Sequence, residues 1–383
     1  MLRAARLSPL ARRGALAAAT AIGGAALINN ENNEATCGAQ PEKFTAPQTL
    51  NGKRTYEMKR RLGAGACGVV YEYTDTTNNK SVAVKFPFSG FTDNERKAFT
   101  ISQQINPNTT YQNHLSPAYE VVELSVLRHG MAAITSGVAV VWGWGGERTL
   151  YEDLKKRSMY ATKEPLPPGG ARLYMEHMMS GLRKLHGAGH IHGDLHMDNV
   201  MVHVDKNGKH YVNLIDFGAC RETNQKWGDV YPSSYRGGKP PATGFYQHPP
   251  ELWTEYVQLE AAGYRKVKWQ EMRVHRGHDV WSAGVIFFVL LGGDIQKLQK
   301  KMVERIEASG GDTSGARKEL EDAVAKFDKA DAALLKACLE PDASKRASAA
   351  DVLTQVREAR KKGLAAATLS GRAQGRADAG RGE

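Results

Sequence analysis

Three polar residues in the second half of the chain could together handle a metal ion and a hydroxyl group. Asp194 and Asn199 stand five residues apart in one short segment, and Asp216 begins a D-F-G triplet after the apolar run 212–215. Carboxylate and amide oxygens suit Mg²⁺, which also keeps positions for phosphate oxygens. A nearby aspartate can orient a substrate hydroxyl and accept its proton. The alternative is three unrelated polar turn residues.

A glycine-rich segment in the first half offers a place for phosphate to bind. Residues 63–70 match G-x-G-x-x-G-x-V, and backbone N–H groups can approach phosphate closely where side chains are missing. Because the chain contains 39 glycines, this match is weak on its own. A dinucleotide-binding fold requires a helix directly after the glycines, whereas residues 69–73 predict a strand.

A lysine ends the next apolar strand, twenty-two residues after Gly63. The run 82–85 is Val-Ala-Val-Lys, so Lys85 would stand at the end of a strand beside the glycine-rich turn. An ammonium group in that place can contact nucleotide phosphates. The alternative is a strand-end lysine that faces solvent, and the nearby glycine segment favours the phosphate-binding interpretation.

The residues that could take part in a reaction need a sheet and several helices to bring them together. Short β-branched or aromatic runs between turn residues predict antiparallel strands, and apolar residues at 3–4 spacing predict helices. The expected strands cover residues 56–62, 68–73, 81–86 and 138–142, and the expected helices are a capped one from about 92 to 105, an amphipathic one over 171–186 and a buried one over 280–291. The pattern indicates a β-rich front part and a helical rear part.

Taken in order, these segments resemble the eukaryotic-type protein kinase family, which uses a glycine-rich loop, a strand lysine, a catalytic loop and a D-F-G triplet. Three later segments extend the resemblance. Residues 249–251 are similar to the A-P-E motif that closes the activation loop, 279–284 to the buried helix below the catalytic loop, and 338–346 to the terminal helical segment. The similarity covers roughly residues 56–358. It implies an α+β, two-lobed kinase-like fold with a β-rich N-lobe and a mainly helical C-lobe.

The resemblance also implies roles for individual residues. Asp194 would orient and deprotonate the acceptor hydroxyl, and Lys85 would contact the α- and β-phosphates of ATP. Transfer needs positioning and charge neutralisation more than covalent chemistry. The implied nucleotide-binding residues are Leu62, Gly63, Gly65, Gly68, Val70 and Lys85, the implied Mg²⁺ ligands are Asn199 and Asp216, residues 138–143 would meet the adenine, and Glu251 would pair with Arg346.

Two residues of the catalytic loop depart from the family pattern. Gly193 stands where the family usually has arginine, and His196 stands where lysine is common. That arginine is the cationic partner of an activation-loop phosphate, which must find such a partner to order the loop. We therefore expect activity that depends little on phosphorylation, and a contact of His196 with the γ-phosphate that is weak or pH-dependent.

Three functions are compatible with this resemblance. The expected one is an ATP- and Mg²⁺-dependent kinase that phosphorylates serine or threonine in a protein substrate. The loop also resembles small-molecule kinases of the aminoglycoside and choline type, but those usually lack A-P-E and the later arginine. A pseudokinase that binds partners without catalysis is the third, and the intact Lys85, Asp194, Asn199 and Asp216 argue against it.

The glutamate that should pair with Lys85 is left open by the sequence. Glu95 stands in the predicted helix after the lysine strand but is close to Lys85 in sequence. Glu123 lies in the run 119–127, which could be a strand or a helix. Both residues therefore remain candidates.

The positive charge of the chain lies mostly at its two ends. The net charge is +11, of which residues 1–30 and 357–383 carry eight, so the body is near +3 and is not expected to bind nucleic acid. The leader is rich in arginine, contains no acid, and its uncharged stretch 14–28 is too short to span a bilayer. These features fit a mitochondrial transit peptide. A secretory signal or a membrane anchor is the alternative, and an anchor would bring membrane contact.

The sequence therefore predicts four regions. They are a targeting leader or weak membrane anchor (1–30), a linker (31–54), a protein kinase domain (55–360, with an N-lobe to about 144 and a C-lobe from about 145) and a disordered basic tail (361–383). The four cysteines are widely spread without C-x-x-C spacing, which excludes a zinc ribbon and a thioredoxin-like site. The sequence does not indicate an oligomeric state.

Overall fold

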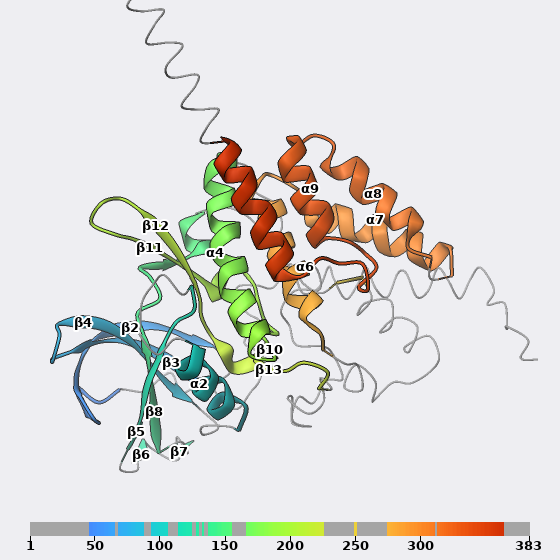
Figure 1. The fold of residues 1–383 in the computed structure, drawn as a ribbon. Coiled ribbons are helices and arrows are strands. Elements are labelled where there is room, and N and C mark those ends of the chain that lie inside the picture. Colours follow the sequence, from blue (N-terminus) through green and yellow to red (C-terminus); the bar gives the residue numbers. More distant parts are fainter. Residues whose placement is uncertain are drawn as a thin grey trace, which may run out of the picture.

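The computed structural model describes residues 46–65, 68–87, 93–105, 114–124, 128–129, 132–133, 137–154, 166–225, 249–250, 274–310 and 312–363. An antiparallel sheet forms one lobe and most of the helices form the other (Figure 1). The predicted α+β, two-lobed architecture is confirmed. The predicted leader and most of the predicted tail lie outside the described residues. Within the described ranges, none of the helices has the length and apolar character needed to cross a membrane.

The sheet of the N-lobe is antiparallel, with the strand order β1-β2-β3-β4-β8-β5. Alternating side chains of the central strands bury Tyr56, Tyr73, Val84 and Phe86 in one core cluster. The four strands expected from the sequence correspond to β2, β3, β4 and β8. The bounds are β1 (Thr49–Asn51), β2 (Thr55–Gly65), β3 (Gly68–Asp75), β4 (Lys80–Pro87), β5 (Ala118–Glu123) and β8 (Val138–Gly143).

One edge of this sheet comes from residues that the sequence assigns to a linker. Residues 46–54 supply β1, and Leu50 is buried in the core of the N-lobe. The turn after β1 is held by the buried carboxylate of Glu120 on β5, which accepts hydrogen bonds from the Tyr56 hydroxyl (2.5 Å) and the Lys53 amide (2.7 Å). The polar composition of this segment hides its role, because few of its side chains face the core.

Helix α2 (Asp93–Ile105) lies between β4 and β5 in the chain and packs against the sheet. It confirms the helix expected from about 92 to 105, whereas Thr92, where the expected cap begins, lies outside the described residues. Phe99 of α2 joins Ala118 and Val140 in a buried cluster, and the Ser102 hydroxyl donates to the Ser116 carbonyl at 2.8 Å. Of the run 119–127, which could be strand or helix, residues 119–123 belong to strand β5, and residues 125–127 lie outside the described residues. A two-stranded hairpin, β6 (Arg128–His129) and β7 (Ala132–Ala133), follows it.

The C-lobe is built around two long helices, α4 and α6, which contact one another. Every residue of α6 from His278 to Leu290 is buried, so this helix is surrounded by protein on all sides. Both helices match the sequence prediction. The bounds are α3 (Leu150–Asp153), α4 (Pro168–Gly187), α6 (Arg276–Leu290), α7 (Ile295–Ala308), α8 (Ser314–Val324), α9 (Lys329–Cys338) and a last helix over residues 349–363.

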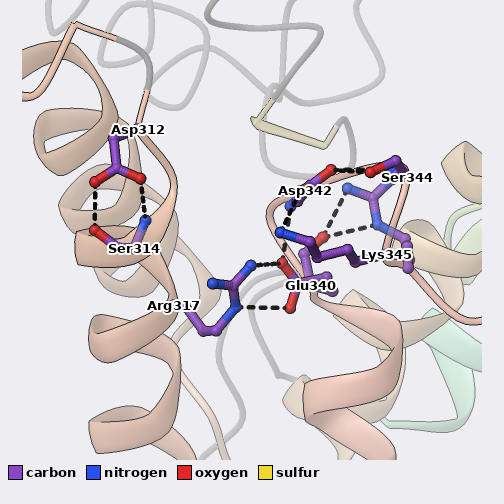
Figure 2. Close-up of polar contacts among 8 residues, drawn as sticks. Asp312, Ser314, Arg317, Glu340, Asp342, Ser344 and Lys345 are labelled. Carbon is purple, nitrogen blue, oxygen red and sulfur yellow. Dashed lines mark hydrogen bonds and ion pairs between the residues drawn. The ribbon is translucent and has the colours of Figure 1, made fainter.

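A cluster of ion pairs ties the segment after α9 to its neighbours (Figure 2). Arg317 of α8 donates two hydrogen bonds to the Glu340 carboxylate, at 2.6 and 3.0 Å. The backbone carbonyl of Glu340 in turn accepts from Arg346 at 2.8 and 3.0 Å. The Arg346 guanidinium lies over the ring of Trp281 at 5.2 Å, so this cluster connects the segment after α9 to α6.

Short strands and 3₁₀ helices carry the loops between the two lobes. Strand β12 (His210–Leu214) pairs with β11 (Val200–Val204), which pairs with β9 (Arg148–Thr149). Strand β10 (His190–Ile191) pairs with β13 (Arg221–Glu222). The 3₁₀ helix η2 (Met197–Asn199) precedes β11, and η3 (Phe217–Ala219) follows β12, so Asn199 and Asp216 are each fixed at the end of a short element.

Two stacked histidines in the C-lobe should make stability depend on pH. The rings of His114 and His177 lie 4.1 Å apart, and burial lowers the pKa of His114 to about 4 and of His177 to about 2. The unfolded chain therefore binds protons that the folded chain excludes. The contribution of the two histidines to the free energy of unfolding is fully present above the ordinary histidine pKa of about 6.5 and decreases as the pH falls below that value. Each pH unit below that value costs about 1.4 kcal/mol per histidine.

Melting curves between pH 7 and 5 should show a smaller loss of Tm in His177→Gln than in the wild type, with His190→Gln as the control. An unchanged slope in His177→Gln would contradict this expectation.

Candidate active site

The strand register places three of the predicted nucleotide-binding residues, Gly63, Val70 and Lys85, in one row across the sheet. Gly63 of β2 faces Val70 of β3, Val70 faces Lys85 of β4, and Lys85 faces Val140 of β8. Opposed residues on neighbouring strands present their side chains on the same face of a sheet. Leu62, beside Gly63, is 39% exposed. The sheet thus brings the glycine-rich segment next to Lys85, although the two are far apart in sequence.

Gly63 and Gly68 differ in the room that the protein leaves for a side chain. A Cβ atom on Gly68 would lie 2.6 Å from the carbonyl oxygen of Phe86, so the packing of β3 against β4 excludes a side chain there. Among the described residues, a Cβ atom on Gly63 would meet no atom within 4 Å. The protein itself does not require a glycine at residue 63, which leaves that surface open for a ligand. Gly65 is paired with Gly68 at the end of the hairpin, and the turn residues 66–67 lie outside the described residues.

The two glycines should respond differently to alanine. Gly68→Ala is expected to lower the melting temperature, because its methyl group overlaps a backbone carbonyl that cannot move freely. Gly63→Ala is expected to leave the melting temperature unchanged and to raise KM for ATP, because the methyl group occupies space on the ligand side. Thermal melts and nucleotide titrations would separate the two effects. A loss of stability in Gly63→Ala equal to that in Gly68→Ala would contradict this assignment.

Lys85 reaches the D-F-G triplet where the sheet meets the helical lobe. Its Nζ lies 3.5 Å from Asp216 Oδ1, and the charge of Lys85 holds the pKa of Asp216 below its ordinary value. Asp216 has a left-handed backbone conformation (φ 56°, ψ 75°) and a half-exposed side chain. The next residue, Phe217, is buried and packs against the rings of Trp142 and His192, with centroids 5.8 and 5.4 Å away. The triplet therefore directs its carboxylate toward Lys85 and its ring into the core.

The structure narrows the choice of a glutamate partner for Lys85. Glu123 is exposed at the end of β5, and β8 separates that strand from the strand of Lys85. Glu95 lies in the first turn of α2, the helix that packs on the sheet and on η3. Its side chain is outside the described part of the structure, so the Glu95 pairing stays a prediction.

The predicted catalytic loop brings Asp194, His196 and Asn199 together. Asn199 Nδ2 donates to the backbone carbonyl of Asp194 at 2.8 Å and lies 3.0 Å from His196 Nε2. His196 Nε2 is 3.7 Å from Asp194 Oδ2. Among the described residues, the other oxygen, Asp194 Oδ1, is buried and has no hydrogen-bond partner. That oxygen can accept the hydrogen of an incoming hydroxyl group.

His196 can supply a positive charge at the position where related loops have lysine. Burial favours the neutral ring, but the negative charges of Asp194, Asp198 and Asp216 outweigh burial and raise the pKa of His196 above its ordinary value. The protonated ring is therefore favoured more than in a free histidine. The weak or pH-dependent contact of His196 with the γ-phosphate stays a prediction.

The catalytic loop is anchored by a buried carboxylate whose contacts the sequence did not specify. Asp279, in the first turn of α6, is 1% exposed. Its Oδ2 accepts from the His192 amide (2.8 Å) and from His186 Nε2 (2.8 Å), and its Oδ1 accepts from the Gly193 amide (3.0 Å). Despite burial, these hydrogen bonds and the nearby histidines hold the pKa of Asp279 below its ordinary value. Asp279 thus fixes the backbone of the two residues before Asp194.

The oxygen atoms near Asp216 suit a hard divalent cation. The amide nitrogen of Asn199 is committed to the backbone of Asp194, so its oxygen is the atom available as a ligand. The Asp216 carboxylate is half-exposed and ionised, and the backbone of residue 215 joins the two segments through a 3.0 Å hydrogen bond to the Asn199 carbonyl. Mg²⁺ accepts one or two protein oxygens and completes its octahedron with water and phosphate. Asn199 and Asp216 fit that requirement.

The predicted Glu251–Arg346 pair lies only partly within the described residues. Arg346 donates to the carbonyl oxygens of Glu340 and Gly277, which places it at the start of α6. Glu251 is outside the described residues. The pair therefore stays a prediction.

Comparison with known proteins gives the class of this fold and site. The family model described as "Protein kinase domain" matches residues 56–356. The chain belongs to the protein kinase family, and membership of this family implies the use of ATP.

Individual relatives are more distant. The serine/threonine-protein kinase NLK2 of Xenopus laevis is 24% identical over 70% of this chain and 51% of its own length. The CBL-interacting serine/threonine-protein kinase 7 of Arabidopsis thaliana is 26% identical over 67% of this chain and 51% of its own length. The serine/threonine-protein kinase MRCK gamma of Mus musculus is 29% identical over 37% of this chain and 8% of its own length. The chain thus spans about half of the length of the first two relatives and a small part of the third.

Proposed function

We propose that the protein is a serine/threonine protein kinase that transfers the γ-phosphate of ATP to a hydroxyl group of a protein substrate. The observation that carries the proposal is the arrangement of the active residues. Lys85 lies 3.5 Å from Asp216, and the catalytic loop presents Asp194 Oδ1 as an acceptor without a partner among the described residues. The names of the similar kinases support serine or threonine as the acceptor.

In this proposal Asp194 orients the acceptor hydroxyl and takes up its proton. Lys85 contacts the phosphates of ATP, and the row Gly63–Val70–Lys85 forms the surface that faces the nucleotide. Mg²⁺, held by Asn199 and Asp216, would neutralise phosphate charge when bound. The Asp279 network keeps the catalytic loop in place, because transfer depends on positioning more than on covalent chemistry.

The test is a transfer assay with the full-length chain. The protein is incubated with γ-labelled ATP and Mg²⁺ together with a generic protein substrate, an aminoglycoside and choline. Label on serine or threonine of the protein supports the proposal. Label on a small molecule would favour the aminoglycoside/choline type instead, and nucleotide binding without transfer would favour a pseudokinase. Omitting Mg²⁺, or adding excess chelator, should abolish transfer.

We further propose that residues 1–30 direct the protein to mitochondria. The support is the arginine-rich, acid-free composition of this segment. A fluorescent fusion to the full-length chain should enter mitochondria, and removing residues 1–30 should prevent entry. A full-length N-terminus on membrane-extracted protein would overturn this proposal in favour of a membrane anchor or the secretory pathway.

A further inference from the structure

The backbone of Gly193, directly before Asp194, leaves no room for a side chain of its own. Its φ of +78° is in the left-handed region that glycine adopts without strain. A Cβ atom there would lie 2.6 Å from the Ala219 carbonyl oxygen, 3.1 Å from Arg221 Nη2 and 3.2 Å from Arg221 Nε. The space beside Gly193 is therefore already occupied by the side chain of another residue.

That residue, Arg221, is an unusually buried cation. It is 2% exposed, whereas arginine is rarely buried to this extent. Its Nε donates to the Ala219 carbonyl at 2.7 Å, and its backbone belongs to β13, where it faces Ile191 of β10. Burying a guanidinium carries a large desolvation cost, so its place beside the catalytic loop needs a reason.

The contacts of Arg221 join the two halves of the active site. On one side it holds Ala219, the third residue after Asp216. On the other side it packs against Gly193, whose amide is bound to Asp279 at 3.0 Å and whose next residue is Asp194. Gly193 is thus bound to Asp279 through its amide and lies beside the Arg221 guanidinium.

We propose that Arg221 is a positioning residue for Asp194, and that its guanidinium fills the place that a side chain at residue 193 would occupy. The inference rests on the proposed kinase function. Arg221 keeps the segment of Asp216 in register with the loop of Asp194, so that both carboxylates face the reacting phosphate together. Because the Arg221 side chain itself connects the segment of Asp216 to the loop of Asp194, this connection does not depend on a phosphorylated residue.

The first test removes the guanidinium and then returns it in solution. Arg221→Ala should lower kcat roughly 10–100-fold, because it loosens the catalytic geometry, with KM for ATP changed much less. Methylguanidinium chloride should restore part of kcat in Arg221→Ala, whereas sodium chloride at equal ionic strength should not. Arg221→Lys should be impaired and insensitive to methylguanidinium, because lysine cannot reproduce a planar fork of donors.

The matched control is Arg172→Ala, which removes another buried arginine. Arg172 of α4 is 8% exposed and donates to Asp331 at 2.7 Å, away from the catalytic loop. This variant should lose stability but keep its kcat at temperatures where it is folded. If Arg221→Ala behaves like Arg172→Ala, with normal kcat in the folded fraction and no rescue, the positioning role is wrong.

A double-mutant cycle with Gly193→Ala tests the packing directly. Alone, Gly193→Ala should reduce kcat, since its methyl group meets Ala219 O and the guanidinium. In the double variant with Arg221→Ala, the added methyl group meets less resistance. The guanidinium is absent, and Ala219 O, which no longer accepts a hydrogen bond from it, can move away. The loss in the double variant should therefore be smaller than the product of the two single losses. Independent, multiplicative losses would overturn the proposal. Wild-type protein that transfers no phosphate at all would instead refute the proposed function, which these variants do not test.

Discussion

Asp194→Asn is expected to lower the rate of phosphoryl transfer by roughly 10²–10⁴-fold while the protein stays folded and binds ATP. Asparagine has nearly the same shape as aspartate but cannot accept a proton. In the structure the carboxylate is held beside His196, and among the described residues Asp194 Oδ1 has no hydrogen-bond partner, which leaves it for the acceptor hydroxyl. Single-turnover assays at saturating ATP would measure the change in the chemical step.

Two neighbouring carboxylates provide the comparison for this experiment. Asp198→Asn changes a half-exposed carboxylate of the same loop, and we expect a small effect on transfer. Asp216→Asn should abolish transfer and also weaken the dependence of ATP binding on Mg²⁺, since it removes an expected metal ligand. Wild-type turnover in Asp194→Asn would mean that the active site lies elsewhere or that a contaminating kinase is being measured.

Asp279→Asn is expected to have the second large effect, through the position of the catalytic loop. Its two oxygens accept from the backbone amides of His192 and Gly193 and from His186. An asparagine has one acceptor oxygen, so its NH₂ group must face at least one of these donors in either orientation. Each buried donor left without an acceptor costs about 1–3 kcal/mol. The loop before Asp194 should shift, and a displacement of about 1 Å can reduce kcat about 10²-fold.

Asp331→Asn is the matched control for this variant. Asp331 is also 1% exposed and accepts a hydrogen bond from a buried arginine, but in α9, apart from the catalytic loop. Denaturant melts should show a loss of stability in both variants. Only Asp279→Asn should have a reduced kcat at temperatures where the protein is folded. Equal kcat values in the two folded variants would show that Asp279 does not position the loop.

Local residue patterns predicted the central strands of the sheet and three of the helices of this protein. Short β-branched or aromatic runs between turn residues predicted β2, β3 and β4. Apolar residues at 3–4 spacing predicted α4, and a nearly all-apolar run predicted the buried helix α6. The order of Lys85, Asp194, Asn199 and Asp216 predicted the site through the resemblance to protein kinases. The run at 119–127 stayed ambiguous, since a short apolar run suits a buried strand and a helix equally.

The same patterns do not report contacts between residues that are distant in sequence. Strand β1 was hidden in a polar segment because it depends on Glu120, which lies on the opposite edge strand in the sheet order. The stacking of His114 on His177 joins two separate segments of the C-lobe. Such pairs depend on how the elements pack, which the composition of neither segment reveals.

Residue types and their spacing predicted which side chains could do chemistry and on which type of element each one lies. Packing between the elements sets how those side chains are held. Strand register brought Gly63 and Lys85 into one row. The burial of α6 places Asp279 against the catalytic loop. Residue 193 has no room for a side chain, because Arg221 and Ala219 occupy the space beside it. Sequence patterns predict elements but not their packing, because periodicity is a property of one segment. Whether a charge is buried or a space is occupied depends on every segment around it.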